Sequence, residues 1–195
     1  MNRSISAQNL VDCAIEEFAT FGYDGASLAG IAEKVGIKKA SIYAHFANKD
    51  SLFMAAFSDC MENEKTLMNQ SFMDETDDDL PGFPYLENTI SHYEKALAAR
   101  FLLRTTFLCP PHLGAQIATF FEDYLNILKR NFENSLLKSK NYNIPPTELP
   151  RIVECFLAIL DSVQIKLIYA DIAAARSRLA ALRYFFAFSL APFKN

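Results

Sequence analysis

The chain has 195 residues, of which 51% are hydrophobic and 22% charged, as is typical of a globular protein with a substantial buried core. This composition excludes a disordered tail or a low-complexity fibre, since both have far fewer apolar residues. Only six glycines and eight prolines are present, too few for a β-sandwich with many turns, so an all-α fold is favoured. The length allows one large domain, or a small domain joined to a medium one.

The formal net charge is −4, so no overall positive field attracts nucleic acid. The acidic excess is concentrated in residues 51–80, above all in the run Asp74-Glu75-Thr76-Asp77-Asp78-Asp79. Such a run is typical of a solvated loop. A nucleic-acid partner would therefore have to be recognised by a local group of cations elsewhere in the chain.

The four cysteines are far apart, form no Cys-x-x-Cys pair and have no histidine at metal-ligand spacing. We therefore expect buried free thiols, no metal site and no cofactor. The acidic residues Asp12, Glu16 and Glu17 argue against a signal peptide, and the apolar run 184–193 is shorter than the ~20 residues that span a bilayer. The sequence predicts a cytoplasmic protein without membrane contact.

In the N-terminal part, apolar residues at helical spacing predict a helix from about Ser4 or Ser6 to Phe21, with Gly22 as its stop. Two short helices follow, over 27–36 and 39–46. Asn48 is expected to cap a fourth helix over about 48–68. Beyond the acidic run and the prolines at 81–84, the pattern predicts helices over 85–108, 113–139, 147–169 and 171–190. Thr147 and Asp171 are the expected N-caps of the last two.

The two short helices and their tight turn have the order of a helix-turn-helix. Gly36 allows the sharp turn, and the apolar Ile37 would fix it to the core. The second helix would then present small and polar side chains to a major groove. This outward set is Lys39, Ala40, Ser41, Tyr43, Ala44 and His45. Donors for phosphates come from Lys38, Lys39, His45 and Lys49, and Ser27 adds a hydroxyl at a helix start.

The stretch from Ser27 to Phe53 resembles the helix-turn-helix of the tetracycline-repressor (TetR) family of bacterial transcription regulators. The resemblance is gapless and is carried by Ile31-Ala32, Val35-Gly36-Ile37, Ser41-Ile42-Tyr43, His45-Phe46, Asn48-Lys49 and Leu52-Phe53. Phe18 and Gly22 agree with it, so about residues 6–55 are covered. The rest of the chain is similar only in length and helical layout.

The resemblance implies that Lys39, Ala40, Ser41 and Ala44 face base edges, with Ala44 limited to an apolar contact such as a thymine methyl. It also implies that the phosphate backbone is held by Ser27, Tyr43, His45 and Lys49. Outside this motif, Tyr43 would be read as a surface aromatic and His45 as an ordinary polar residue. Lys38 either contacts DNA or is simply a lysine in an exposed turn.

The resemblance further implies a DNA-binding domain over 1–48 and an effector-binding and dimerisation domain over 49–195, linked by the helix at about 48–68. The larger domain is rich in aromatic residues, most of which are expected in its core. Polar residues on otherwise apolar helices are the candidates for contacting an effector. These are His92, Tyr93, Arg104, His112, Gln116, Tyr124, Asp161 and Gln164. Each could instead have a capping, surface or interhelical role, and Arg104 and His112 could lie by a hinge between the domains.

The last two helices are apolar on more than one face, which indicates burial on two sides. A single thick core would satisfy this pattern, and so would a partner. The resemblance implies a homodimer through about 148–190, with the paired helices forming a four-helix bundle. Two recognition helices ~34–36 Å apart would then match successive major grooves.

The resulting hypothesis is a ligand-responsive transcriptional regulator, a repressor that a small hydrophobic effector releases from palindromic double-stranded operator DNA. Activation in place of repression depends on where the operator lies. The alternative is a helical small-molecule-binding or scaffold protein that does not act through DNA. An enzyme has little support, because the three histidines form no Glu-x-x-His motif and there is no glycine-rich phosphate loop.

Overall fold

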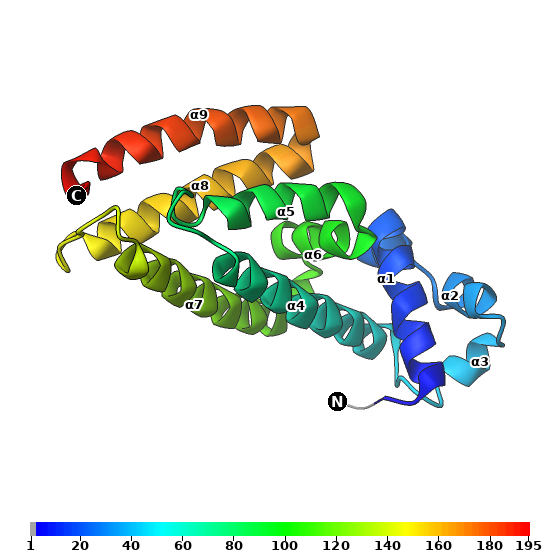
Figure 1. Cartoon of the computed structure of the whole chain (residues 1–195). Coiled ribbons are helices and arrows are strands. Elements are labelled where there is room, and N and C mark those ends of the chain that lie inside the picture. The colour runs from blue at the N-terminus through cyan, green and yellow to red at the C-terminus, as the bar shows by residue number, and fades with distance from the viewer. Residues whose placement is uncertain (1–2) are drawn as a thin grey trace. The chain divides into compact units, whose positions relative to one another are not determined.

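The computed structural model describes residues 3–195, and within that range the protein is all-α, as predicted. The described part contains no β-strand beyond one isolated bridge between Tyr142 and Lys194. The helices, labelled in Figure 1, are α1 (Ile5–Gly25), α2 (Leu28–Val35), α3 (Lys39–Ile42), α4 (Lys49–Met73), α5 (Phe83–Lys95), α6 (Leu97–Phe107), α7 (Gly114–Lys138), α8 (Leu149–Tyr169) and α9 (Ile172–Leu190). Two 3₁₀ turns, η1 (Pro111–Leu113) and η2 (Ala191–Phe193), complete the series.

The chain forms two compact units. The first unit contains the residues up to Glu64 together with Ala96–Phe121, and the second contains Lys65–Lys95 together with Glu122–Asn195. Two helices, α4 and α7, therefore begin in the first unit and end in the second. The functional boundary near residue 48 remains a prediction, and residues 1 and 2 of the predicted domain 1–48 lie outside the described residues.

In the first unit, α1 packs against α2 and α6, and α2 packs against α3. Three aromatic rings join α1, α4 and α6. Phe18 lies 4.8 Å from Phe53 and 5.9 Å from Phe101, measured between ring centroids, and each of the three is 1% exposed. Rings at these separations add favourable edge and stacking contacts to the apolar area they bury. This core holds the predicted DNA-binding segment in place.

The predicted helix starts in this unit are confirmed. Ser4 caps α1, and Ser27 accepts a hydrogen bond of 2.9 Å from the backbone N–H of Gly30 at the start of α2. Before α4, Asn48 accepts a hydrogen bond of 2.8 Å from the backbone N–H of Ser51. These side chains satisfy backbone donors that have no partner inside the helix.

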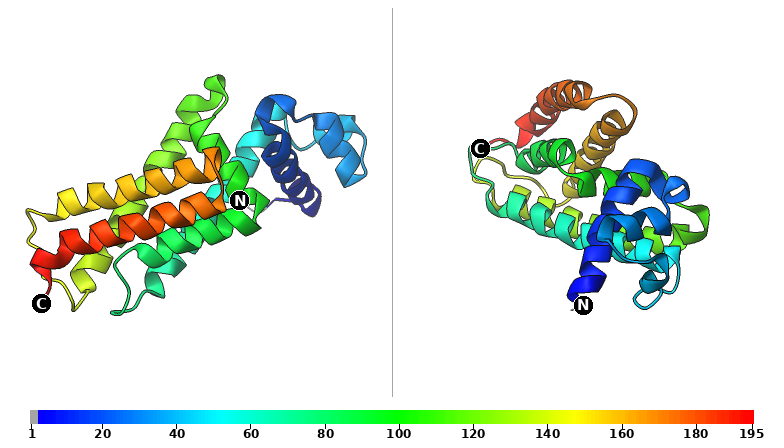
Figure 2. Two further views of the ribbon diagram at one scale, coloured as in Figure 1. Left: turned by 90° about the horizontal axis from the view of Figure 1, so that it is seen from above. Right: turned by 90° about the vertical axis from the view of Figure 1, so that its right-hand side faces the viewer.

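In the second unit, α8 and α9 lie side by side and α5 packs on both of them (Figure 2). The core centres on the rings of Phe132 and Phe156, which stack with centroids 3.9 Å apart. The predicted cap of α9 is confirmed, because Asp171 accepts a hydrogen bond of 2.7 Å from the backbone N–H of Ala174.

Several expectations about local structure are wrong. The predicted helix over 85–108 is broken at Ala96, whose backbone is extended, so that α5 packs with the second unit and α6 with the first. Thr147 does not cap α8. Glu148 occupies the N-cap position without a side-chain hydrogen bond, and Pro150 in the first turn removes one backbone donor that a cap would satisfy.

The cysteines are also less buried than predicted. Cys60 is buried, but Cys13 and Cys109 are half-buried, and Cys155 lies on the exposed side of α8. Among the described residues, no helix combines the length and the hydrophobicity that a bilayer crossing requires.

Candidate nucleic-acid interface

The turn between α2 and α3 is built on one glycine. Gly36 has φ +78°, in the left-handed region that side chains with a Cβ avoid. Its backbone N–H donates to the carbonyl of Glu33 (3.1 Å), and the N–H of Ile37 donates to the carbonyl of Ala32 (2.9 Å). These bonds use carbonyls at the end of α2 and turn the chain sharply into α3.

The residues after this turn divide into a buried pair and an exposed set. Ile42 and Phe46 are 0% and 8% exposed, which anchors the segment to the first unit. The helix α3 is shorter than predicted and continues as turns up to Phe46. All the other predicted contact residues of this segment are exposed: Lys38, Lys39, Ala40, Ser41, Tyr43, Ala44 and His45.

The chemistry of this exposed set suits a polyanion. Residues 27–49 contain four lysines and one glutamate, so this segment is basic although the whole chain is acidic. Ala40, Ser41 and Ala44 are small and leave room for close approach to a flat surface. Tyr43, with 52% of its surface exposed, offers both a ring and a hydroxyl. Local cations of this kind govern affinity for phosphates, whatever the sum over the chain.

The remaining two predicted residues flank the exposed set. Ser27 is exposed at the start of α2, where its hydroxyl is already used as the cap. Lys49 is half-buried at the start of α4, and its Nζ lies 4.4 Å from the centroid of the Tyr23 ring. A cation held over an aromatic face has a preferred position, so Tyr23 orients this lysine.

One buried carboxylate in this unit was not recognised from the sequence. Glu17 is 6% exposed, and its Oε2 lies 3.0 Å from the Nζ of Lys34 on α2. The backbone N–H of Ser27 lies 3.4 Å from its Oε1, and a Cβ at Gly30 would come within 2.8 Å of the same atom. Glu17 therefore ties α1 to α2, and Gly30 leaves it the space. The signal was a charged residue on the apolar face of a predicted helix.

A second polar group connects three segments of the first unit. The hydroxyl of Tyr23 donates to Asp50, and His112 Nε2 lies 3.2 Å from Asp50 Oδ1. The rings of Tyr23 and His112 meet edge to face, with centroids 5.3 Å apart. Burial and the carboxylate of Asp50 raise the pKa of Tyr23 to about 12. The same hydrogen bond, together with that of His112, lowers the pKa of Asp50.

The predicted effector residues are divided between the two units. Arg104, His112 and Gln116 are exposed residues of the first unit, and the guanidinium of Arg104 lies against Gly22. In the second unit, Tyr124 and Gln164 are buried, with 4% and 7% exposed. The hydroxyls of Tyr124 and Tyr85 share a hydrogen bond. The other members are half-buried or exposed: His92, Tyr93 and Asp161.

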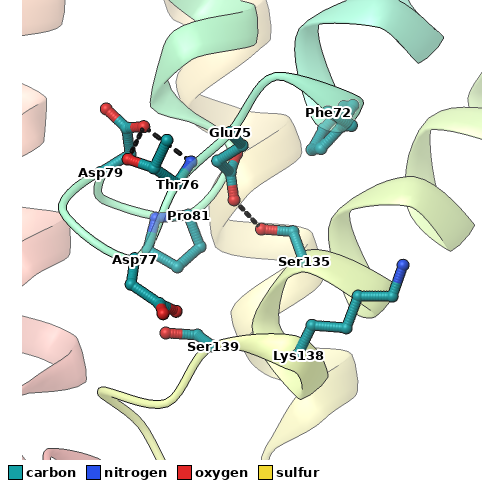
Figure 3. Close-up of a pocket in the computed structure, with 9 residues that line it drawn as sticks. All are labelled: Phe72, Glu75, Thr76, Asp77, Asp79, Pro81, Ser135, Lys138 and Ser139. Atoms are coloured by element: carbon teal, nitrogen blue, oxygen red, sulfur yellow. Dashed lines mark hydrogen bonds between the residues drawn. The ribbon is translucent and has the colours of Figure 1, made fainter.

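The loop with the acidic run borders a pocket of about 260 Å³ at the C-terminal end of α7 (Figure 3). Glu75 is half-buried there, accepting hydrogen bonds from the backbone N–H of Gly82 (2.8 Å) and from the hydroxyl of Ser135. Burial raises the pKa of Glu75, against the effect of these two bonds. The neighbouring Asp77 pairs with Lys140 at 2.9 Å. The run is thus only partly the solvated loop that the sequence predicts.

None of the eight predicted effector residues lines this pocket. Within residues 3–195, no three histidine, cysteine or acidic side chains are placed to hold a metal ion.

Known proteins share both the motif and the fold. Residues 10–56 match the model of the bacterial regulatory proteins of the tetR family. Over 64 residues the chain is 42% identical to IcaR of Staphylococcus aureus, described as the HTH-type negative transcriptional regulator of the biofilm operon icaADBC. That match covers 32% of this chain and 34% of IcaR, so the similarity spans about a third of the relative. The IcaR of Staphylococcus epidermidis is 41% identical over 51 residues, or 26% of this chain and 28% of that protein.

Solved structures extend the likeness to the whole fold. A TetR transcriptional regulator from Chloroflexus aurantiacus superposes with a TM-score of 0.73 and 17% identity, over 93% of this chain and 94% of the other. The fatty acid degradation regulator FadR from Bacillus halodurans gives a TM-score of 0.68 and 20% identity, over 93% and 96%. These likenesses define a helix-turn-helix protein with a larger helical domain. The match to the TetR family of bacterial regulatory proteins covers residues 10–56, and the rest of the chain is similar to structures of that family in fold.

Proposed function

We propose that the protein is a DNA-binding transcriptional regulator that acts as a repressor on a palindromic operator. The observation that carries this is the division of residues 38–46 into a buried anchor and an exposed set. Ile42 and Phe46 fix the segment, while the small and cationic side chains beside them remain accessible. Lys39, Ala40, Ser41 and Ala44 take the base edges. Phosphates are held by Ser27, Tyr43, His45 and Lys49, with Lys38 as a further donor.

The proposed functional domains are 1–48 for DNA and 49–195 for effector and partner, joined by α4. A two-fold dimer presents two recognition segments to successive major grooves. Its proposed interface is formed by α8 and α9, where large apolar side chains remain exposed in one chain. Their exposed fractions range from 46% to 73%, for Ile165, Tyr169, Tyr184, Phe185 and Phe188. Covering this surface with a second copy removes it from water.

The proposed effector is a small hydrophobic molecule bound in the second unit. Tyr124 and Gln164 are its first candidates, because they are polar side chains buried among apolar helices. A structural relative with 18% identity, FadR of Bacillus subtilis, is described in complex with stearoyl-CoA, which supports an apolar effector only through the common fold. Effector binding that moves α4 lowers operator affinity, and operator DNA must lower effector affinity by the same factor.

The test is binding of the purified protein to DNA fragments that flank its own gene, with excess competitor DNA and at several salt concentrations. We expect one preferred fragment. Lys49→Ala should weaken binding to it and reduce the slope of log affinity against log salt by about one, as for a single phosphate contact. Lys39→Ala should instead weaken the preference for that fragment over competitor.

Lys138→Ala is the matched control, since it also removes a lysine but at the end of α7 in the second unit. It should leave both the affinity and the salt slope unchanged. If a folded dimeric protein prefers no fragment, and genome-wide DNA selection also yields none, the DNA-binding proposal is wrong. The alternative, a helical protein that binds small molecules or acts as a scaffold without DNA, would then hold.

A further inference from the structure

The two helices that run from the first unit into the second are joined at their starts. Asp50 is the second residue of α4, and His112 lies in η1, directly before α7. The Nε2 atom of His112 lies 3.2 Å from Oδ1 of Asp50, across 62 positions of sequence. Both starts lie in the first unit, so the Asp50–His112 contact joins the beginning of α4 to the segment directly before α7.

Tyr23 makes this contact part of a larger group, which we call the Tyr23 cluster: Tyr23, Lys49, Asp50 and His112. The Tyr23 hydroxyl donates to Asp50, its ring meets the His112 ring edge to face, and the ammonium of Lys49 lies over it. Lys49 is the proposed phosphate contact at the start of α4, three residues after the buried anchor Phe46. The cluster thus connects η1 to a side chain of the proposed DNA surface.

The charges around His112 determine how its protonation acts. From α4 it faces the carboxylate of Asp50, with the cation of Lys49 beside it. From the end of α1 it faces Tyr23, whose neighbour Asp24 adds a second negative charge. The Arg104 guanidinium of α6 lies against Gly22, the residue before Tyr23.

About half of the His112 side chain is exposed, at 52%, so solvent reaches the ring. Histidine is the side chain type whose charge changes between pH 5 and 8. A neutral His112 can donate to Asp50 only in the tautomer with its proton on Nε2, whereas a protonated ring always carries that proton and adds a positive charge opposite the carboxylate. The contact is therefore tighter in the protonated state.

We propose that the Tyr23 cluster is a proton-sensitive latch, in which protonation of His112 ties η1 to the start of α4 and raises the affinity for operator DNA. The inference rests on the proposed function and adds a regulatory input to it. A latched α4 holds Lys49 and the preceding recognition segment in one arrangement, so less freedom is lost on binding DNA. The added positive charge acts in the same direction, since it lies close to a surface that meets phosphates.

The test measures operator affinity between pH 5.5 and 8.0 at constant ionic strength for the wild-type protein and for His112→Gln. We expect the wild-type protein to bind about threefold to fivefold more tightly at pH 5.5 than at pH 8.0, and His112→Gln to lose most of that difference. His45 is a second histidine and a proposed phosphate contact, so His45→Gln is the matched control. It should weaken binding at every pH but keep the part of the pH dependence that comes from His112.

A second measurement does not use DNA. The NMR signals of the carbon-bound protons of the His112 ring, followed from pH 5.5 to 8.0, should change their pH dependence in Asp50→Asn, because the latch requires these two side chains to be in contact. Circular dichroism checks that each variant is folded.

Each outcome decides a separate point. Identical pH profiles for the wild-type protein and His112→Gln would overturn the latch while leaving the regulator intact. An unchanged His112 titration in Asp50→Asn would also overturn it. Failure of the wild-type protein to bind any operator at any pH would refute the proposed function, and the latch with it.

Discussion

Each unit contains a turn with a glycine in the left-handed region in front of a helix, but one turn is open and the other is packed against the core. Gly36 precedes α3 in the first unit and Gly82 precedes α5 in the second, and both have φ +78°. A Cβ at Gly36 would meet no atom within 4 Å, whereas one at Gly82 would lie 2.5 Å from the Phe156 ring and 2.8 Å from the Phe132 ring. The first unit keeps its turn open to solvent, and the second presses its turn onto the core.

Two glutamates, the buried Glu17 and the half-buried Glu75, show a second difference between the units. Glu17 in the first unit pairs with the cation of Lys34, while the two hydrogen-bond donors of Glu75 in the second unit, Ser135 and Gly82, are both neutral. An open turn with its charges paired suits the proposed DNA-binding surface, which would then meet DNA without rearranging. A closed turn over stacked rings instead fixes the loop that covers the end of the second unit. The same local chemistry therefore has a different purpose in each unit.

The largest effect that would test this comparison is expected at the glycines. Gly82→Ala adds a methyl group into the ring pair and forces a Cβ into the left-handed region, so it should lower the free energy of unfolding by about 3 kcal/mol or more. Gly36→Ala bears only the backbone cost and should lose about 1 kcal/mol. Urea unfolding of both variants measures the difference. Equal losses would mean that the two turns are not packed differently.

The sequence allowed the first unit to be predicted better than the second, for a physical reason. The recognition segment is defined by neighbours in sequence: Gly36 sets the turn, and Ile42 and Phe46 are spaced to reach one core. The motif therefore predicted both the helices and the exposed residues. The break at Ala96 could not be seen, because it depends on α5 and α6 packing in different units.

The polar contacts of Asp50 and Glu75 also could not be predicted from local sequence patterns. Asp50 meets His112 across 62 positions, and Glu75 meets Ser135 across 60. Neither spacing is periodic in a helix, so only the tertiary fold brings these side chains together. His112 itself was singled out, with a place by a hinge as one of its readings. Its partners Tyr23 and Asp50 were not.

An intermediate effect is expected on the outward face of α9. Phe185 is 68% exposed in one chain and lies in the proposed dimer interface. Phe185→Glu places a charge there twice, once in each copy, so the dimer dissociation constant should rise by about 100-fold or more. Sedimentation equilibrium measures it, and operator affinity should fall in parallel, because one half-site alone binds weakly.

Leu137→Glu is the matched control for this face. Leu137 is equally apolar and 63% exposed, but it lies near the end of α7 and outside α8 and α9. The substitution should leave the protein dimeric. If Leu137→Glu dissociates the protein and Phe185→Glu does not, the partner surface is on α7 and the proposed interface is wrong.

The smallest expected effects are those of replacing the two glutamates, Glu75 and Glu17, by glutamine, which should change the free energy of unfolding in opposite directions. Because burial raises the pKa of Glu75 in the folded protein, the folded state binds its proton more readily than the unfolded chain does. Protonated Glu75 therefore adds to the free energy of unfolding. This contribution is fully present below the pKa of a glutamate in the unfolded chain, near 4.3, and is lost as the pH rises through the higher pKa of Glu75 in the folded protein. Glu75→Gln should remove this slope and match or exceed wild-type stability at pH 7, by less than about 1 kcal/mol.

Glu17→Gln should act in the opposite direction. It removes the charge that pairs with Lys34 at 3.0 Å but keeps an acceptor for the backbone of Ser27, so stability at pH 7 should fall by about 1–2 kcal/mol. Lys34 is partly exposed, at 38% of its side chain, and so retains water as an alternative partner, which keeps the loss below that of a fully buried pair. Urea unfolding of both variants from pH 4 to 8 compares them directly. If both substitutions destabilise the protein at pH 7, then Glu75 with its neutral donors stabilises the fold as Glu17 with its cation does. The two units would then differ in packing but not in the energetics of these glutamates.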